Sequence, residues 1–360
     1  MTFKSRPDAP SGTNADFRDF RLAALCARIA VLSLFLAGGP ISAQTRSEQA
    51  ARQANSSANA EANAPASRLF TDETGRRVEI PTNVKRVVSL APNLTEIVFA
   101  LGKGDQLAGD TDFCDYPPEA AQKPRVGGPV NPNLEQIVAL TPDLVLATKS
   151  INRHETVDAL DRLGLPVYVT NPHSVEEMVT SVEHIGNALH TEKNAQALVK
   201  DLRERLSGLD RRLASAAPRR VLFVVWTDPL ISIGRDTFIS DALRHAGARS
   251  VVDTADEWPR VNLEEIIRLQ PEVLVFASAH AGDTQQDIDA LRSRPGWKDL
   301  DAVRDGKIVV ISDAINRPAP RMVDAIEQLA RALHSESFVS RNSAWAGPKQ
   351  ITEEACACAR

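Results

Sequence analysis

Cysteine and histidine are scarce in this chain of 360 residues. Four cysteines, one of them in the N-terminal leader described below, do not make a disulfide framework. The sequence leaves open whether Cys356 and Cys358 pair with each other or with Cys114. The seven histidines are scattered and provide no close pair of ligands, so a bare zinc or manganese site is not expected.

Stretches rich in lysine or arginine are also missing. The chain has 42 basic and 47 acidic side chains, which makes it mildly acidic. A nucleic-acid-binding surface needs basic residues clustered on one face or in one run. We therefore expect no nucleic acid among the partners of this protein.

Catalytic motifs are not recognisable in the sequence. It lacks a Gly-x-Ser-x-Gly elbow, a glycine-rich phosphate loop and a Cys/His pairing in motif context. Ser89 and Asp110 are expected near the ends of strands, where α/β enzymes often place catalytic groups, but no histidine is positioned to complete a triad. An α/β enzyme remains an alternative, and the prediction is a binding protein that is not an enzyme and has no cofactor.

The chain has little in the way of long hydrophobic runs, and the run near its N-terminus is short. The nine residues 29–37 (IAVLSLFLA) are too few to span a bilayer, and small residues follow at positions 42 and 43. This pattern predicts a signal peptide over residues 1–43 and export to the periplasm. Residues 44–68 are rich in Ala, Asn, Ser and Gln, which predicts a disordered linker. Residues 335–360 are again polar and are expected to form a flexible tail.

One segment of the chain occurs twice. The stretch NLEQIVALTPDLVLA at 133–147 returns 129 positions later as NLEEIIRLQPEVLVFA at 262–277, with six identical positions in register. Each copy reads as a short helix, a proline that stops it and a buried strand. Asn133 is a predicted N-cap with Gln136 at the capping-box position, and Asn262 with Glu265 repeats this arrangement.

The repeat belongs to two α/β halves of the chain. Residues 69–190 and 218–334 each alternate strand and helix patterns, and Asn93 is expected to cap the first helix with Glu96 at its box position. Residues 191–217 lie between them and contain a leucine-spaced helical pattern, Glu192 to Ala214, that would reach roughly 35 Å. The predicted fold is two Rossmann-like lobes joined by one long rigid helix. Residues 87–90 and 167–170 are predicted strands of the first half, and residues 221–226 are expected to begin the second half as 87–90 begins the first.

Several motifs resemble a known family when taken together. They are RVVSLAPNLTEIVFALG, DTDFCDYPPEA, NLEQIVALTPDLVLA, RVLFVVWTDPLISIGRDT, EWPRVNLEE and SDAINRPAPR. In this order they resemble the periplasmic vitamin B12 (cobalamin)-binding proteins of ABC importers, which have a helical backbone. The resemblance implies a monomer that holds a corrinoid in a cleft between its lobes, closes little, and docks onto a two-fold permease.

The resemblance also implies residues that contact the permease. Family members pair one Glu in each lobe with the transmembrane subunits, and the matching positions are Glu135 and Glu264. Both are first-turn carboxylates that the predicted caps do not require. The alternative is that each one only stabilises its helix dipole, which is worth a few tenths of a kcal/mol.

A flat corrin ring needs aromatic surfaces and some hydrogen bonds to its amide rim. By resemblance the aromatic contacts are Phe113, Trp226 and Trp258, and the polar ones are Asp313 and Arg317. The alternatives are that Trp226 belongs to the core and that Trp258 packs between the lobes. A nearby arginine, Arg321, could equally serve a local salt bridge.

The sequence departs from the family at several positions. Pro129, Thr148 and Ala314 stand where family members place further tryptophans, Asn316 replaces an acid, and the cysteines of a second-lobe disulfide are not matched. A ferric-siderophore or haem-binding protein of the same fold is therefore the competing prediction. Such a site would need several Arg or Tyr residues, whereas this chain offers few Tyr and mainly arginines 260, 317 and 321.

Overall fold

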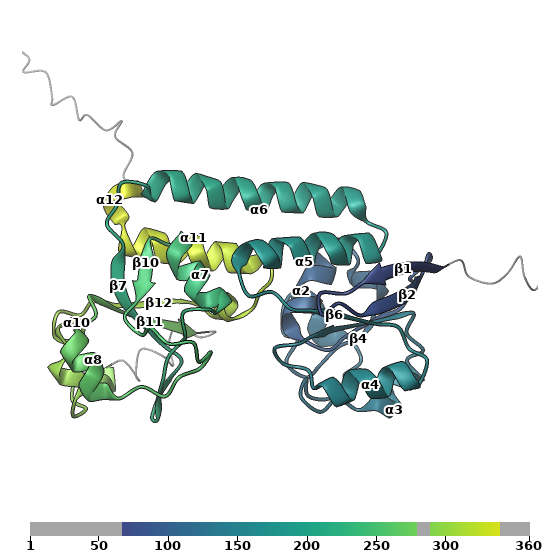
Figure 1. Ribbon diagram of the computed structural model, residues 1–360, viewed down its shortest axis with the longest axis horizontal. Coiled ribbons are helices and arrows are strands. Elements are labelled where there is room, and N and C mark those ends of the chain that lie inside the picture. Colours follow the sequence, from purple (N-terminus) through teal and green to yellow (C-terminus); the bar gives the residue numbers. More distant parts are fainter. Residues whose placement is uncertain (1–66, 279–288, 339–360) are drawn as a thin grey trace, which may run out of the picture. The chain divides into compact units, whose positions relative to one another are not determined.

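A computed structural model describes residues 67–278 and 289–338 of the chain (Figure 1). The predicted signal peptide, most of the predicted linker and tail, and Cys356 and Cys358 lie outside the described residues. No described helix combines the length and apolar character needed to span a membrane.

The described chain contains two four-stranded parallel sheets with the same strand order. The first sheet has the order β4-β3-β5-β6 and the second has the order β10-β7-β11-β12. In each sheet the first strand along the chain is flanked by the second and the third, so the topology is repeated along with the sequence. The strands are β3 (Val87–Ser89), β4 (Leu107–Gly109), β5 (Leu144–Thr148), β6 (Val167–Thr170), β7 (Arg219–Val224), β10 (Ala248–Ser250), β11 (Val273–Ser278) and β12 (Ile308–Ser312).

Helices connect and cover these strands, as parallel pairing requires. The α-helices are α2 (Pro92–Ala100), α3 (Leu134–Ala139), α4 (His154–Arg162), α5 (Val175–Ala188), α6 (Glu192–Leu213), α7 (Phe238–His245), α8 (Leu263–Leu269), α10 (Asp301–Arg304), α11 (Arg321–Leu333) and α12 (Ser335–Phe338). Short 3₁₀ helices are η1 (Gly104–Gln106), η2 (Ala120–Gln122), η3 (Trp297–Asp299) and η4 (Asp313–Asn316), and small hairpins are β1 (Ser67–Thr71) with β2 (Arg77–Pro81) and β8 (Trp226–Thr227) with β9 (Leu230–Ile231). The predicted two-lobed α/β fold is confirmed. Sequence analysis missed α5, which Ser174 caps by accepting a hydrogen bond from the amide of Glu177.

The duplicated segment has nearly the same local geometry in both lobes. The Asn133 side chain accepts a hydrogen bond from the amide of Gln136 (3.1 Å), as predicted. The Asn262 side chain caps α8 through the amide of Glu264 (2.9 Å), one residue earlier than the predicted position. Both copies therefore begin with an asparagine cap.

The predicted cap of α2 is wrong. The helix begins at Pro92, and its N-cap is Ala91, which makes no side-chain hydrogen bond. Proline suits the first helical position because its missing amide proton would have no partner there. Asn93 lies inside the helix and is buried, and the Glu96 carboxylate is directed to arginines of the second lobe instead of to the cap.

Each sheet is covered by helices on both faces. The apolar cluster on one face stays within its lobe, whereas the cluster on the other face continues from one lobe into the other. On one face, α3 and α4 enclose a cluster confined to the first lobe, and α8 and α10 enclose one confined to the second. On the other face a single apolar cluster runs from Leu144 of the first sheet to Val275 of the second, through α5, α6, α7 and α11. Figure 1 shows α6 running alongside α5 and α11. The lobes are joined by this shared core as well as by one long helix.

Ion pairs on α6 fasten both lobes to it. Arg203 bonds Glu176 on α5 at 2.6 Å, and Arg205 bonds Asp324 and Glu327 on α11 at 2.5 and 3.0 Å. The neighbouring arginines thus point to helices of different lobes. Apolar packing and ion pairs thus both join α6 to helices of each lobe.

Both ends of the folded region extend beyond their predicted boundaries. Residues 67 and 68, assigned to the linker, belong to β1, which pairs with β2 in an antiparallel hairpin. Residues 335–338, assigned to the tail, form α12, because Phe338 packs beneath Arg212 and Arg331, whose guanidinium carbons lie 5.0 and 4.9 Å from the ring centre.

Candidate functional site

The predicted ligand residues follow the carboxyl ends of the parallel strands. Phe113 lies four residues after β4, Trp226 two residues after β7, and Asp313 directly after β12. Open α/β sheets bind their ligands in the crevice beyond the carboxyl ends of their strands. The topology therefore puts residues from both lobes at equivalent edges.

The three predicted aromatic side chains are exposed. Phe113 is 62 % exposed, Trp226 61 % and Trp258 48 %. The Trp226 indole donates a hydrogen bond to the carbonyl of Asp228 (2.9 Å), which fixes its orientation without burying it. The alternative in which Trp226 belongs to the core is wrong. Large exposed aromatic rings present apolar surface that a ligand can cover.

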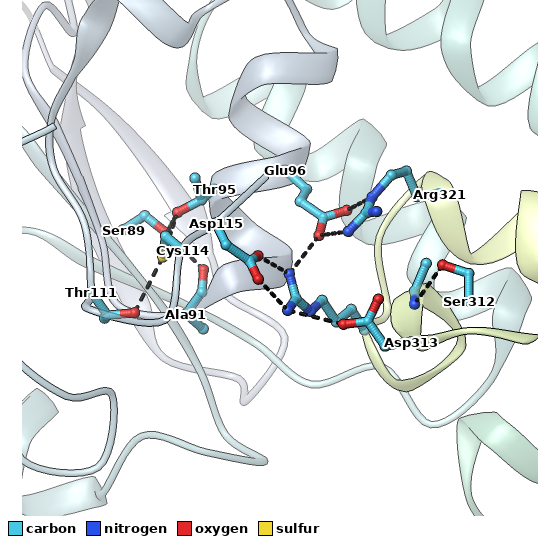
Figure 2. Close-up of polar contacts among 12 residues, drawn as sticks. Ser89, Ala91, Thr95, Glu96, Thr111, Cys114, Asp115, Ser312, Asp313 and Arg321 are labelled. Carbon is cyan, nitrogen blue, oxygen red and sulfur yellow. Dashed lines mark hydrogen bonds and ion pairs between the residues drawn. The ribbon is translucent and has the colours of Figure 1, made fainter. Parts of the chain in front are cut away.

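The two predicted polar residues, Asp313 and Arg317, belong to a charged cluster that joins the lobes, and Figure 2 labels its members Glu96, Asp115, Asp313 and Arg321. Arg317 bonds Asp313 in its own lobe at 3.2 Å. The same guanidinium bonds Asp115 of the first lobe at 2.5 and 3.2 Å and Glu96 at 3.2 Å. Arg321 bonds Glu96 through two nitrogens, at 2.9 and 2.7 Å. Its salt bridge is therefore between lobes and not local.

A tyrosine closes one side of this cluster. The Arg321 guanidinium lies 3.7 Å from the centre of the Tyr116 ring. A pocket of about 520 Å³ opens beside it, lined by Glu96, Phe99, Tyr116, Pro320 and Arg321 among others. Phe113, Trp226 and Trp258 do not line this pocket, so it is separate from the exposed aromatic surfaces.

The charges in the cluster stabilise one another. The hydrogen bond from Arg317 lowers the pKa of Asp115 and keeps its carboxylate ionised. Burial disfavours the charge on Arg317, but its hydrogen bond with Asp115 and the surrounding carboxylates raise its pKa. Three carboxylates, Glu96, Asp115 and Asp313, face two guanidinium groups, so the cluster carries a formal charge of −1 (+2 − 3).

The loop that carries Phe113 and Asp115 is fixed by hydrogen bonds from the side chain of Arg125. One nitrogen of Arg125 donates to the Asp110 carboxylate (2.6 Å) and to the carbonyls of Thr111 (2.6 Å) and Cys114 (3.1 Å). The Cys114 thiol is buried, and burial raises its pKa, so it is a neutral hydrogen-bonding group. Arg125 therefore fixes the backbone from which Phe113 and Asp115 project.

A buried amide holds the other strand-end loops of the first lobe together. Asn152 donates to the carbonyls of Leu90 (2.9 Å) and Pro129 (2.8 Å), and its oxygen accepts from the amide of Thr148 (2.7 Å). Pro129 and Thr148 are two of the positions where the resembling family has tryptophan. Sequence analysis missed Asn152, because a single asparagine after a strand gives no signal that two of its three partners, Leu90 and Pro129, are 62 and 23 residues away in the sequence.

The predicted docking acids lie at equivalent places in the two lobes. Glu135 is in the first turn of α3 and Glu264 in the first turn of α8, and both are exposed. Among the described residues neither carboxylate makes an ion pair or hydrogen bond, whereas the adjacent Glu265 bonds Arg268 at 3.6 Å. Two unpaired acids thus occupy matched positions of the repeat.

Within residues 67–278 and 289–338, no group of three or more His, Cys, Asp and Glu side chains is arranged to hold a metal ion.

Comparison with known proteins gives matches along most of the folded region. A family model described as periplasmic binding protein matches residues 87–314. A vitamin B12-binding protein of Vibrio parahaemolyticus is 33 % identical over 257 residues, which are 71 % of this chain and 90 % of that relative.

Solved structures share the two-lobed fold. The crystal structure of the periplasmic vitamin B12-binding protein of Vibrio cholerae matches with a TM-score of 0.63 and 28 % identity, over 71 % of this chain and 99 % of that one. The periplasmic heme-binding protein of Roseiflexus sp. RS-1 in its apo form also matches with a TM-score of 0.63, at 26 % identity, over 71 % of this chain and 100 % of that one. Proteins named for different ligands therefore resemble this backbone equally well.

Proposed function

The chain belongs to the periplasmic binding protein family, and from this premise we propose that it captures a corrinoid, cobalamin or cobinamide, and delivers it to an ABC importer. Members of this family bind substrates for transport and are not enzymes, which agrees with the missing catalytic motifs. The first relative reported above is named for vitamin B12 and is covered over nine tenths of its length.

The observation that carries the proposal is the exposure of three aromatic side chains beyond the sheet strands of both lobes, two of them on loops and Trp226 at the start of the short strand β8. Phe113 comes from the first lobe, and Trp226 and Trp258 come from the second. A corrin ring is flat, and burial of its faces against such rings stabilises the complex through the hydrophobic effect. In the proposal these residues pack against the ring, while Asp313 and Arg317 stand at its polar edge.

Absorbance titrations with cyanocobalamin, cobinamide, haemin and a ferric chelate test the ligand. We expect saturable binding of a corrinoid, and a loss of about tenfold or more in affinity for Trp226→Ala or Trp258→Ala. Leu69→Ala is the matched control, because Leu69 is 57 % exposed on the β1–β2 hairpin. Binding of haemin or the ferric chelate alone would replace the corrinoid by the competing ligand class.

The permease is the second part of the proposal. Glu135 and Glu264 are exposed, occupy matched repeat positions and make no ion pair with another described residue, so they suit a two-fold symmetric partner that presents basic residues. The double variant Glu135→Ala/Glu264→Ala should keep its affinity for the ligand and lose uptake in cells that depend on this protein. Glu265→Ala is the control, since Glu265 is adjacent and already paired. Normal uptake by the double variant would refute the docking role.

Export by a signal peptide over residues 1–43 is also part of the proposal. Protein recovered from the periplasm should begin after Ala43, as N-terminal sequencing would reveal. A chain that begins at Met1 in that fraction would contradict it.

A further inference from the structure

The charged cluster between the lobes contains a residue that no ligand contact requires, Asp115. We propose that Asp115 is a specificity residue, which occupies the guanidinium of Arg317 and so withholds that charge from ligands that carry carboxylates. The site then favours ligands with an uncharged or cationic rim over anionic chelates. This inference rests on the proposed function and deepens it, because it assigns the charge class of the ligand.

The geometry of Arg317 supports this role. Both of its terminal nitrogens are used by Asp115, at 2.5 and 3.2 Å, in the forked arrangement that binds a carboxylate most strongly. The remaining contacts of these two nitrogens go to Glu96 and Asp313, each at 3.2 Å. A ligand carboxylate would have to displace Asp115 to obtain the same two bonds.

Exposure within the pair is uneven. The side chain of Arg317 is 18 % exposed and that of Asp115 is 63 % exposed. An approaching ligand therefore meets the carboxylate before the guanidinium. Asp115 also lies two residues after Phe113, so this negative charge stands beside one of the proposed ring contacts.

The second arginine of the cluster, Arg321, is also kept from ligand carboxylates by partners within the protein. Arg321 donates twice to Glu96, whose side chain is 2 % exposed, and stacks on Tyr116. With a formal charge of −1 on the cluster, a further anion at this place is repelled. An uncharged amide rim is not repelled, and it can accept hydrogen bonds from the guanidinium edge or donate to the carboxylates.

The test compares two substitutions that remove the same charge from the same loop. In Asp115→Asn the guanidinium of Arg317 loses its forked partner. Asp112→Asn is the matched control, because Asp112 is exposed and its carboxylate makes no ion pair with a described residue. Haemin and cyanocobalamin are titrated against both variants and the unsubstituted protein by absorbance, and circular dichroism verifies that each variant is folded.

We expect Asp115→Asn to bind haemin about three- to tenfold more tightly than the unsubstituted protein and to change cyanocobalamin affinity by less than about twofold. Asp112→Asn should leave the haemin affinity unchanged within about twofold. Adding Arg317→Gln to Asp115→Asn should abolish the gain, since the gain requires the freed guanidinium. The gain should also shrink at high salt, where the Debye length falls to about 3 Å at 1 M.

Two results would overturn the inference. Equal haemin affinities for Asp115→Asn and Asp112→Asn would remove the specific role of Asp115, and so would a tenfold loss of cyanocobalamin affinity in folded Asp115→Asn. Failure of the proposed function has a different signature, namely an unsubstituted protein that binds haemin and no corrinoid.

Discussion

Thr141 and Gln270, which are 129 positions apart, have almost the same left-handed backbone conformation, with φ angles of 44° and 43°. Each residue stands between the repeated helix and the proline that precedes the strand. In both lobes an arginine donates to the end of that helix: Arg86 to the carbonyl of Leu140 (2.7 Å) and Arg220 to that of Leu269 (3.0 Å). The duplication therefore extends to the way in which the helix ends.

These two residues should respond differently to glycine. A left-handed conformation is unfavourable by roughly 1–2 kcal/mol for a residue with a Cβ, and most so for a β-branched one. Thr141→Gly should raise the free energy of unfolding by up to about 1 kcal/mol, after the entropy of the more flexible chain is subtracted. Gln270→Gly should give no gain, because the Gln270 side chain bonds the amide of Asp301 (2.9 Å) and the carbonyl of Asp299 (3.2 Å). Urea unfolding of both variants measures the difference, and an equal gain in both would contradict it.

The contact between α5 and α6 depends on a glycine. A Cβ at Gly186 would collide with the Cβ of Ala195 on α6. We expect Gly186→Ala to lower the free energy of unfolding by roughly 1–3 kcal/mol through overpacking, despite the better helix propensity of alanine. Ala195→Gly should rescue it, so the double variant should be more stable than the sum of the single changes predicts. A double-mutant cycle by urea unfolding measures this coupling. Additive effects would show that the helices separate without strain.

Asn152 should contribute strongly to the free energy of unfolding, because its side chain bonds three backbone groups. Alanine at this position would leave the buried carbonyl of Leu90, the buried amide of Thr148 and the half-buried carbonyl of Pro129 without their partner. We expect a loss of about 2–3 kcal/mol in the free energy of unfolding, since each unsatisfied buried group is unfavourable by roughly 1–3 kcal/mol. Asn131→Ala, at an exposed position of a nearby loop, should be close to neutral. Similar unfolding curves for the two variants would refute the role of the buried amide.

Asp110 should make stability depend on pH. Burial raises the pKa of its carboxyl from 3.8 to about 6, although Arg125 opposes the shift. Between these values the native state holds a proton that the unfolded chain has released, so stability contributed by this group falls as the pH rises through about 6. The difference in free energy of unfolding between the unsubstituted protein and Asp110→Asn should therefore decrease from pH 4 to pH 7. A difference that grows with pH would show that attraction to Arg125 outweighs burial.

Much of the fold follows from local patterns in the chain. The repeat predicts two equivalent lobes, and leucine spacing predicts a helix from Glu192 that ends within one residue of the observed Leu213. Asn133 and Asn262 are recognisable caps because a cap involves only its own first turn. Local signals failed at Asn93, where a proline at the preceding position begins the helix instead.

The candidate site was only partly predictable. The positions of Phe113 and Trp226 near strand ends can be read from the chain, whereas the strand before Asp313 was not predicted, and the roles of all three residues stay predictions. The partners of Arg317 could not be found in this way: Asp115 is 202 residues away and Glu96 is 221 residues away. No local spacing encodes such a pair.

The sequence by itself determined the doubled α/β organisation, the long helix between the halves and the side chains available at the strand ends. Only the tertiary structure decided that the halves share one apolar core along that helix, and that carboxylates from one lobe neutralise arginines from the other. The physical reason is the separation along the chain of the residues that interact. Caps and periodic patterns act within a few residues, whereas packing and ion pairs join groups that the chain brings together only after it folds.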